Sequence, residues 1–226
     1  LEMSRPRGFR YNGVKPLIDN GVIEEWEIDE KCIHILQSFS AYDFLDIDSR
    51  DNFFSRINEE SNNAALRMAQ ESPVLLKNTG VLPLSPTTVA LTGPNADRLV
   101  FGGGSGIGNP YPQYISTLYS AFCTKGAYDV RLVNKASDCK DAEVIIVCVG
   151  FDHTTEKEGA DRTYALPDGQ DELILNAINS GKKVVVIVNS GGEIDIARWK
   201  DSVDAILMAW YPGQAGGEAI AQIITG

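Results

Sequence analysis

The sequence predicts an α/β fold in which helices cover both faces of a mostly parallel β-sheet. Two observations carry this prediction. Short runs that are apolar throughout, such as residues 144–149 and 184–188, are typical of strands buried on both faces. These runs alternate along the chain with helical patterns, which is the order of βαβ units. The 226 residues are enough for one such domain and an additional arm.

The first seventy residues have a different pattern. Residues 1–20 are polar and interrupted by Pro and Gly, so we expect an extended arm there. A helix is expected over residues 22–42, where apolar residues recur at helical spacing behind an acidic start. The mixed polar stretch 46–58 is typical of a linker, and residues 61–70, which open on Ser and Asn as capping candidates, predict a second helix.

From residue 74 onward the pattern alternates between strand and helix. Strands are expected over residues 74–78, 89–93, 128–133, 143–149, 183–189 and 203–210, and helices over residues 114–123, 169–180, 194–199 and 216–224. Open α/β sheets bind ligands at the carboxyl ends of their strands. The long loop that follows residues 143–149 is therefore the first candidate site.

The charge balance excludes several partners. The formal net charge is −11, which argues against nucleic acid and against an acidic membrane surface and is compatible with a neutral substrate. No apolar run reaches the roughly 20 residues of a membrane span, and no signal peptide is recognisable, so the compartment stays open. The chain begins Leu-Glu-Met and its last helix has no closing segment, so we expect a piece of something larger.

The cysteines and histidines do not predict a metal site. The four cysteines form no CxxC pair, and only two histidines are present, so a structural zinc site is not expected. Cys148 lies in an apolar strand and is expected to be a small hydrophobic side chain. Whether Cys123 and Cys139 form a bridge stays open.

The loop after residues 143–149 has the densest charge. Its charged residues are Asp152, Glu156, Lys157, Glu158, Asp161 and Arg162. A carboxylate with an arginine four residues later suits acid/base chemistry or the binding of a polar ligand. The alternative from the residues alone is a solvated charged loop. His153 could contact a ligand, although a single loop histidine is more often solvated or structural.

Three glycine-rich segments also follow expected strands. The loop containing Gly102, Gly103, Gly104 and Ser105 does not fit the dinucleotide fingerprint and does not open directly into a helix, which favours a loop near a ligand over phosphate binding. A plain surface loop is the alternative. The segments 189–193 and 210–218 are expected only to turn strands into helices. No Gly-x-Ser-x-Gly elbow occurs, so Ser/His/Asp catalysis is not supported.

Four segments, taken in order, resemble the second domain of glycoside hydrolase family 3. They are residues 21–29, 69–84, 147–174 and 203–217, and the clearest motif is Glu-Lys-Glu-Gly-Ala-Asp-Arg at residues 156–162. The resemblance implies a TIM barrel followed by an αβα sandwich with a six-stranded sheet. On this basis residues 1–44 are the tail end of the barrel, residues 45–72 an interdomain linker and helix, and residues 73–226 the sandwich.

The resemblance also implies an activity. Family members are retaining, exo-acting β-glycosidases, so the chain is expected to belong to an enzyme that releases terminal β-linked sugars from an oligosaccharide or glucoside. A β-glucosidase is favoured, weakly, because Gly follows the second glutamate of the motif. No metal or cofactor is required, and the partner is the barrel, in the same gene product or in a separate chain. A non-catalytic carbohydrate-binding or docking module is the alternative.

The roles of single residues follow from the same resemblance. Glu158 is the expected acid/base and Glu156 its rival, while Asp161 and Arg162 are expected to fix the loop. Gly103, Gly104 and Ser105 resemble a loop that lines the outer subsites. The nucleophilic aspartate belongs to the barrel and its motif is not in this sequence, so the chain is expected to be inactive alone.

Overall fold

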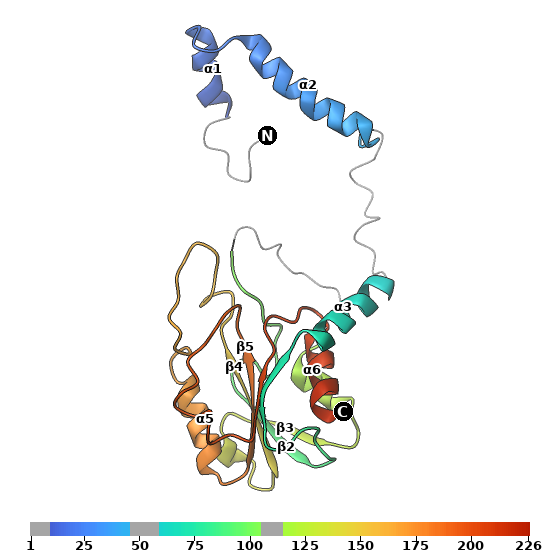
Figure 1. Ribbon diagram of the computed structural model, residues 1–226, viewed down its shortest axis with the longest axis vertical. Helices are drawn as coiled ribbons and strands as arrows, with labels where there is room; N and C mark the ends of the chain where they lie inside the picture. Colours follow the sequence, from blue (N-terminus) through green and yellow to red (C-terminus); the bar gives the residue numbers. More distant parts are fainter. Residues whose placement is uncertain (1–9, 46–58, 105–114) are drawn as a thin grey trace. The chain divides into compact units, whose positions relative to one another are not determined.

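The computed structural model describes residues 10–45, 59–104 and 115–226 (Figure 1). The chain divides into two compact units, Leu1–Arg56 and Ile57–Gly226. Each is described by itself.

The first unit contains two helices, α1 (Tyr11–Asp19) and α2 (Glu25–Ala41). The expected extended arm is therefore wrong for residues 11–19. Two local bonds accompany this helix: Lys15 pairs with Asp19 at 2.7 Å, and the Asn20 side chain donates to the carbonyl of Pro16 at 2.7 Å. The helix α2 lies inside the predicted range 22–42. Neither helix has a buried residue, and large apolar side chains such as Trp26 remain exposed.

The second unit contains the predicted αβα sandwich. Its elements are α3 (Glu59–Glu71), β1 (Val74–Asn78), β2 (Thr88–Thr92), α4 (Leu118–Cys123), β3 (Asp129–Leu132), the 3₁₀ turn η2 (Ala136–Asp138), β4 (Val144–Gly150), α5 (Gln170–Asn179), β5 (Lys183–Asn189), β6 (Ala205–Met208) and α6 (Gly216–Thr225). The six strands form one sheet in the order β1-β6-β5-β4-β2-β3. Only the pairing of β1 with β6 is antiparallel, so the prediction of a mostly parallel sheet is confirmed.

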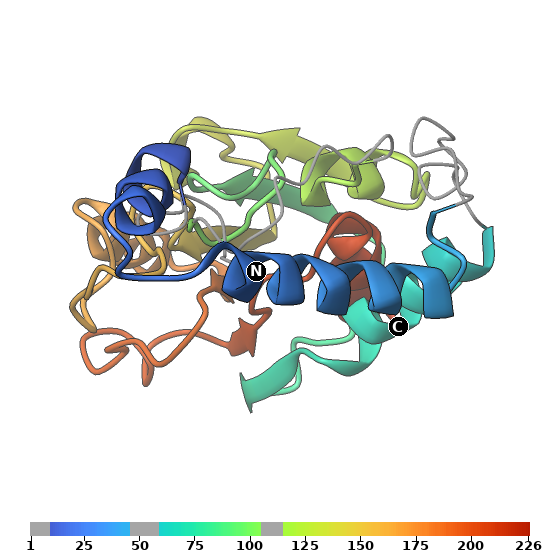
Figure 2. The same cartoon turned by 90° about the horizontal axis from the view of Figure 1, so that it is seen from above.

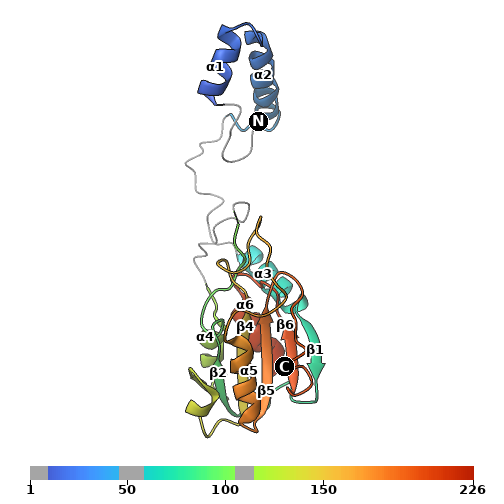
Figure 3. The same ribbon diagram turned by 90° about the vertical axis from the view of Figure 1, so that its left-hand side faces the viewer.

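Helices cover both faces of the sheet. The helix α5 packs on one face, and α4 and α6 pack on the other, with α3 against α6 (Figures 1 and 3). Seen from above in Figure 2, α5 (orange) and α6 (red) again lie on opposite sides. Alternate residues of β4 explain the two layers, because Ile145 and Val147 face the α5 side and Ile146 and Cys148 face the α4 and α6 side.

Two predicted helices differ from the structure. Residues 194–199 form no helix; a turn covers residues 197–200, where the Lys200 N–H donates to the carbonyl of Ile196 at 3.0 Å. The apolar residues of this segment pack against the core beside α5 without forming a helix. Trp199 is buried there and donates its indole N–H to Asp171 at 2.8 Å. The helix α4 begins later than predicted, since Thr117 caps it by accepting the N–H of Ser120 at 3.0 Å.

The structure also bears on disulfide bonds and on membrane-spanning helices. All four cysteines are free, with Cys32 and Cys123 exposed and Cys139 and Cys148 buried. Burial raises the pKa of the Cys148 thiol far above its ordinary value. Among the described residues, no helix has both the length and the apolar character needed to cross a bilayer.

Candidate active site

The charged loop runs from the end of β4 to the start of α5, and one side chain joins its two ends. The amide of Gln170 accepts the N–H of Gly150 at 2.6 Å and donates to the Gly150 carbonyl at 2.9 Å. Gly150 has φ +125°, and a Cβ there would lie 1.8 Å from the carbonyl oxygen of Asn189. Only glycine therefore lets β4 end this close to β5.

The first carboxylate of the loop, Asp152, is a structural cap. One of its oxygens accepts the N–H and hydroxyl groups of Thr154 and Thr155, and the other accepts Arg98 at 2.8 Å. Partial burial alone raises the pKa of Asp152, but the threonine hydrogen bonds and the charge of Arg98 outweigh it and hold that pKa well below its ordinary value. Asp152 thus stays ionised and shapes the start of the loop.

Glu156 is held by three donors from three different segments. Its Oε1 accepts Arg162 Nε at 2.6 Å, and its Oε2 accepts the Gly191 N–H at 2.7 Å and the hydroxyl of Tyr211. Partial burial raises the pKa of Glu156, but the bonds from Tyr211 and Gly191 and the charge of Arg162 outweigh that effect, and the pKa lies below its ordinary value. Glu156 is therefore an ionised, fully engaged carboxylate.

Arg162 connects the loop to the carboxyl end of β5. Besides Glu156, its guanidinium donates to Ser190 Oγ at 2.9 Å and to the carbonyl of Glu193 at 3.0 Å. The guanidinium carbon lies 4.1 Å from the centre of the Phe151 ring, a cation–π distance. With a side chain only 15% exposed, Arg162 has the contacts of a residue that fixes the loop.

Glu158 lies against the glycine segment. The Gly103 N–H donates to the carbonyl of Glu156 at 2.8 Å, and the Glu158 N–H donates to the carbonyl of Gly103 at 2.9 Å, so the two loops pair as in a short parallel bridge. A Cβ at Gly104 would lie 2.7 Å from Glu158 Cβ and 3.1 Å from Glu158 Oε2. Glu158 is an exposed residue, and its side chain lies beside Gly104.

The other predicted site residues lie near this pair or outside the described residues. His153 is exposed and stacks on Phe101, with ring centres 4.9 Å apart and an interplanar angle of 11°. Asp161 is exposed. Ser105 lies outside the described residues. Within those residues, no group of three or more His, Cys, Asp or Glu side chains is gathered to hold a metal ion.

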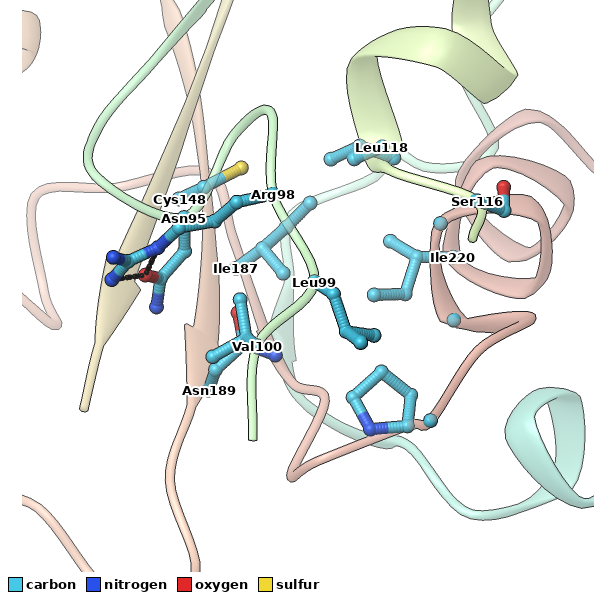
Figure 4. Close-up of a pocket in the computed structure, with 14 residues that line it drawn as sticks. Asn95, Arg98, Leu99, Val100, Ser116, Leu118, Cys148, Ile187, Asn189 and Ile220 are labelled. Carbon is cyan, nitrogen blue, oxygen red and sulfur yellow. Dashed lines mark hydrogen bonds between the residues drawn. The ribbon is translucent and has the colours of Figure 1, made fainter. Parts of the chain in front are cut away.

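A small cavity lies beneath the segment that leads to the glycines. Its volume is about 30 Å³, and Asn95, Arg98, Val100, Ile187 and Asn189 are among its lining residues (Figure 4). Figure 4 shows Arg98 reaching across Asn95, whose Oδ1 accepts Arg98 Nη2 at 2.7 Å. The space suffices for one or two water molecules and not for a sugar ring. This cavity is therefore not the candidate site for a sugar.

Several residues that hold the loop were not predicted. Gln170, Gly191 and Tyr211 each bind the loop, but the segments of Gly191 and Tyr211 were expected only to turn strands into helices. The strand order could have indicated them. Gly191 follows β5, the parallel neighbour of β4, and Tyr211 follows β6, the parallel neighbour of β5. The carboxyl ends of such strands meet at one edge of the sheet.

The fold and the site together define a class of domain. It is an αβα sandwich with an acidic loop at the carboxyl edge of its sheet, and hydrogen bonds from neighbouring segments hold this loop. Residues 73–226 match the Glycosyl hydrolase family 3 C-terminal domain. The chain belongs to glycoside hydrolase family 3, and the resemblance noted in the sequence is confirmed.

Individual relatives agree with this assignment. The exo-1,4-beta-xylosidase xlnD of Aspergillus oryzae is 35% identical over 193 residues, which are 75% of this chain and 24% of that protein. Beta-D-xylosidase 3 of Arabidopsis thaliana is 29% identical over 91% of this chain and 30% of its own length. The chain therefore spans about a quarter to a third of the curated relatives it matches.

Solved structures are similar in fold. A GH3 exo-beta-xylosidase (XlnD) in complex with a xylobiose aziridine activity-based probe has a TM-score of 0.79 and 29% identity, over 95% of this chain and 30% of that one. A beta-glucosidase from Listeria innocua in complex with isofagomine has a TM-score of 0.79 at 22% identity, over 94% of this chain and 32% of that one. The second likeness is one of fold alone.

Proposed function

We propose that this chain supplies the acid/base loop of a retaining, exo-acting β-glycosidase and that Glu158 is the acid/base. The observation that carries the proposal is the contrast between the two glutamates of the motif. The Glu156 side chain is only 19% exposed and accepts hydrogen bonds from Arg162, Gly191 and Tyr211, whereas Glu158 is an exposed residue that lies beside Gly104.

Protonation of the leaving-group oxygen, the first step of the proposed reaction, favours Glu158 over Glu156 as the general acid. A general acid must hold a proton near neutral pH and must reach the glycosidic oxygen. The lowered pKa of Glu156 opposes the first condition, and its three hydrogen-bond donors occupy the oxygens that the second condition needs. Glu156 is better suited to support the loop.

The proposed reaction has two steps. Glu158 protonates the leaving oxygen while a second carboxylate, about 5–5.5 Å away, forms the glycosyl-enzyme; Glu158 then takes a proton from the water that releases the sugar. We assign the second carboxylate to a barrel, with residues 1–44 as its tail end, residues 45–72 as the connection and residues 73–226 as the sandwich. The uncovered apolar side chains of α1 and α2 support this division.

We propose β-xylosides as the first substrates to test and β-glucosides as the second. The two relatives named above at 35% and 29% identity are xylosidases, whereas the glucosidase structure at 22% supports the fold alone. Gly159, directly after Glu158, favours glucosides instead. Hydrolysis of 4-nitrophenyl β-xyloside and β-glucoside, compared as kcat/KM, decides between the two sugars.

The test of the proposal uses the chain joined to its barrel as the gene encodes them. Glu158→Gln should lower the rate of turnover of an alkyl glycoside by about 10²-fold or more, because that leaving group needs a proton. Azide should restore part of the turnover of an activated aryl glycoside and yield a glycosyl azide. The matched control is Glu143→Gln, an exposed glutamate beside the amino end of β4, which should keep full activity.

Three outcomes would contradict the proposal: full activity of Glu158→Gln, equal losses in Glu158→Gln and Glu143→Gln, or a gene without a barrel. Sugar binding without any turnover in the wild-type protein would leave a carbohydrate-binding module as the function.

A further inference from the structure

Tyr211 joins the carboxyl end of β6 to both loops of the candidate site. Its hydroxyl donates to Glu156 Oε2, and its ring covers the glycine segment, since a Cβ at Gly102 would lie 3.1 Å from Tyr211 Cε2. The side chain is half-buried. Tyr211 therefore touches the acidic loop and the glycine loop at the same place, although it lies 55 residues after Glu156.

The residue before Tyr211, Trp210, has a strained backbone conformation. Trp210 has φ +53°, in the left-handed region that non-glycine residues rarely adopt. Two hydrogen bonds hold it there: Asn189 Nδ2 donates to the Trp210 carbonyl at 2.9 Å, and Trp210 Nε1 donates to the Ser72 carbonyl at 3.2 Å. Strain of this kind persists where the surroundings over-determine the conformation, often at functional sites.

The contacts of Tyr211 lead to Glu158 through Glu156. The side chain of Glu156 is fixed by Tyr211, Arg162 and Gly191, and its own carbonyl accepts the N–H of Gly103. The Gly103 carbonyl in turn accepts the N–H of Glu158. The bonded path from the Tyr211 hydroxyl to the Glu158 backbone thus contains only Glu156 and Gly103.

We propose that Tyr211 is a positioning residue for Glu158, acting through Glu156 to hold the acid/base loop against the glycine loop. This inference rests on the proposed function, because it takes Glu158 as the acid/base. Removal of its hydroxyl leaves Glu156 bound to Arg162 and Gly191 but frees the loop to shift. A shift of about 1 Å at a catalytic group can cost about 10²-fold in rate.

The position of an acid matters only for leaving groups that need a proton. Tyr211→Phe should therefore lower kcat/KM for an alkyl glycoside by about 10- to 100-fold. The same variant should change kcat/KM for a 2,4-dinitrophenyl glycoside by about twofold or less, because that leaving group departs without protonation. A role in folding alone would lower both values equally.

The experiment compares Tyr211→Phe with Tyr128→Phe in the chain joined to its barrel. Tyr128 is a matched control, because its hydroxyl donates to the Leu84 carbonyl at 2.6 Å beside the amino end of β3. Tyr128→Phe should leave the ratio of the two kcat/KM values unchanged. Hydrogen exchange at the Gly103 and Glu158 amides should accelerate in Tyr211→Phe and not in Tyr128→Phe.

The remaining outcomes separate this inference from the function on which it rests. Equal loss on both substrates, or no loss, in Tyr211→Phe overturns the positioning role while Glu158→Gln still shows the leaving-group effect. Absence of that effect in Glu158→Gln overturns the function itself. If Tyr211→Phe does not fold, Glu156→Gln carries the test: the same selective loss without azide rescue is expected, and an equal loss on both substrates, or azide rescue that would make Glu156 the acid/base, overturns the inference.

Discussion

The side chain of Gln170 closes the acidic loop by binding both backbone groups of Gly150, at 2.6 and 2.9 Å. Gln170 is 8% exposed, so neither bond is replaced by water when it is lost. A single amide at the start of α5 thus joins the two ends of the loop that carries Glu156 and Glu158.

Replacing Gln170 by Ala should therefore destabilise the sandwich. Two buried backbone groups of Gly150 lose their partner, which predicts a decrease of about 2–4 kcal/mol in the free energy of unfolding. Urea denaturation of the chain measures it. The control is Glu172→Ala, on the exposed side of α5 with an ion pair to Arg198 at 3.3 Å, which should change the free energy by about 0.5 kcal/mol or less. Equal effects of the two variants would contradict the role of Gln170.

The stability contributed by Glu156 should depend on pH. The folded pKa of Glu156 lies below its ordinary value of 4.5, so the ionised form favours the folded state. This contribution is fully present above pH 4.5 and is lost as the pH falls through the folded pKa. Glu156→Gln removes it, so the variant should be less stable than the wild type at pH 7, by about 1–2 kcal/mol.

The measurement is urea denaturation of both proteins at steps from pH 7 to pH 3. The difference in free energy should shrink below pH 4.5. Asp152 and Asp204 also have lowered pKa values, but they are present in both proteins and cancel in the difference. A difference that stays constant down to pH 3 would exclude the ion pair with Arg162 as its cause.

Gly104→Ala should damage the candidate site more than the fold. The new Cβ would lie 2.7 Å from Glu158 Cβ, and φ +147° is strained for alanine, so Glu158 must move. We expect turnover of alkyl glycosides to fall by about 10-fold or more in the chain joined to its barrel. Gly126→Ala is the matched control, because a Cβ there meets nothing within 4 Å, and it should be fully active. Normal activity of Gly104→Ala would exclude close packing against Glu158.

The thiols should react in two classes. Cys32 and Cys123 are exposed and Cys139 and Cys148 are buried, so a thiol reagent such as DTNB should modify two thiols rapidly in the folded chain and four after denaturation. The raised pKa of Cys148 adds to its slow reaction, because the thiolate is the reactive form. Cys123→Ser should reduce the rapid class to one thiol. Rapid reaction of four thiols in the folded chain would contradict the burial of β4.

The fold class could be predicted from the sequence alone, and so could the loop that we propose as the site. Strand β4 is apolar throughout and β5 is apolar between Lys183 and Asn189, and that pattern is stable only between two layers of helices. The loop after β4 stood out because its charges follow such a strand directly. The arm was misjudged because Gly13 and Pro16 suggested a break, whereas the local pairing of Lys15 with Asp19 supports a helix.

The two glutamates of the motif differ only in their tertiary surroundings, and the proposal of Glu158 as the acid/base rests on that difference. Glu156 and Glu158 are two residues apart and chemically identical, so the difference between them comes from partners that are distant in the sequence. Gly191 lies 35 residues after Glu156 and Tyr211 lies 55 residues after it, and the parallel sheet brings both to the same edge. Their hydrogen bonds, with the charge of Arg162, stabilise Glu156 as an ion, whereas Glu158 is an exposed residue beside Gly104.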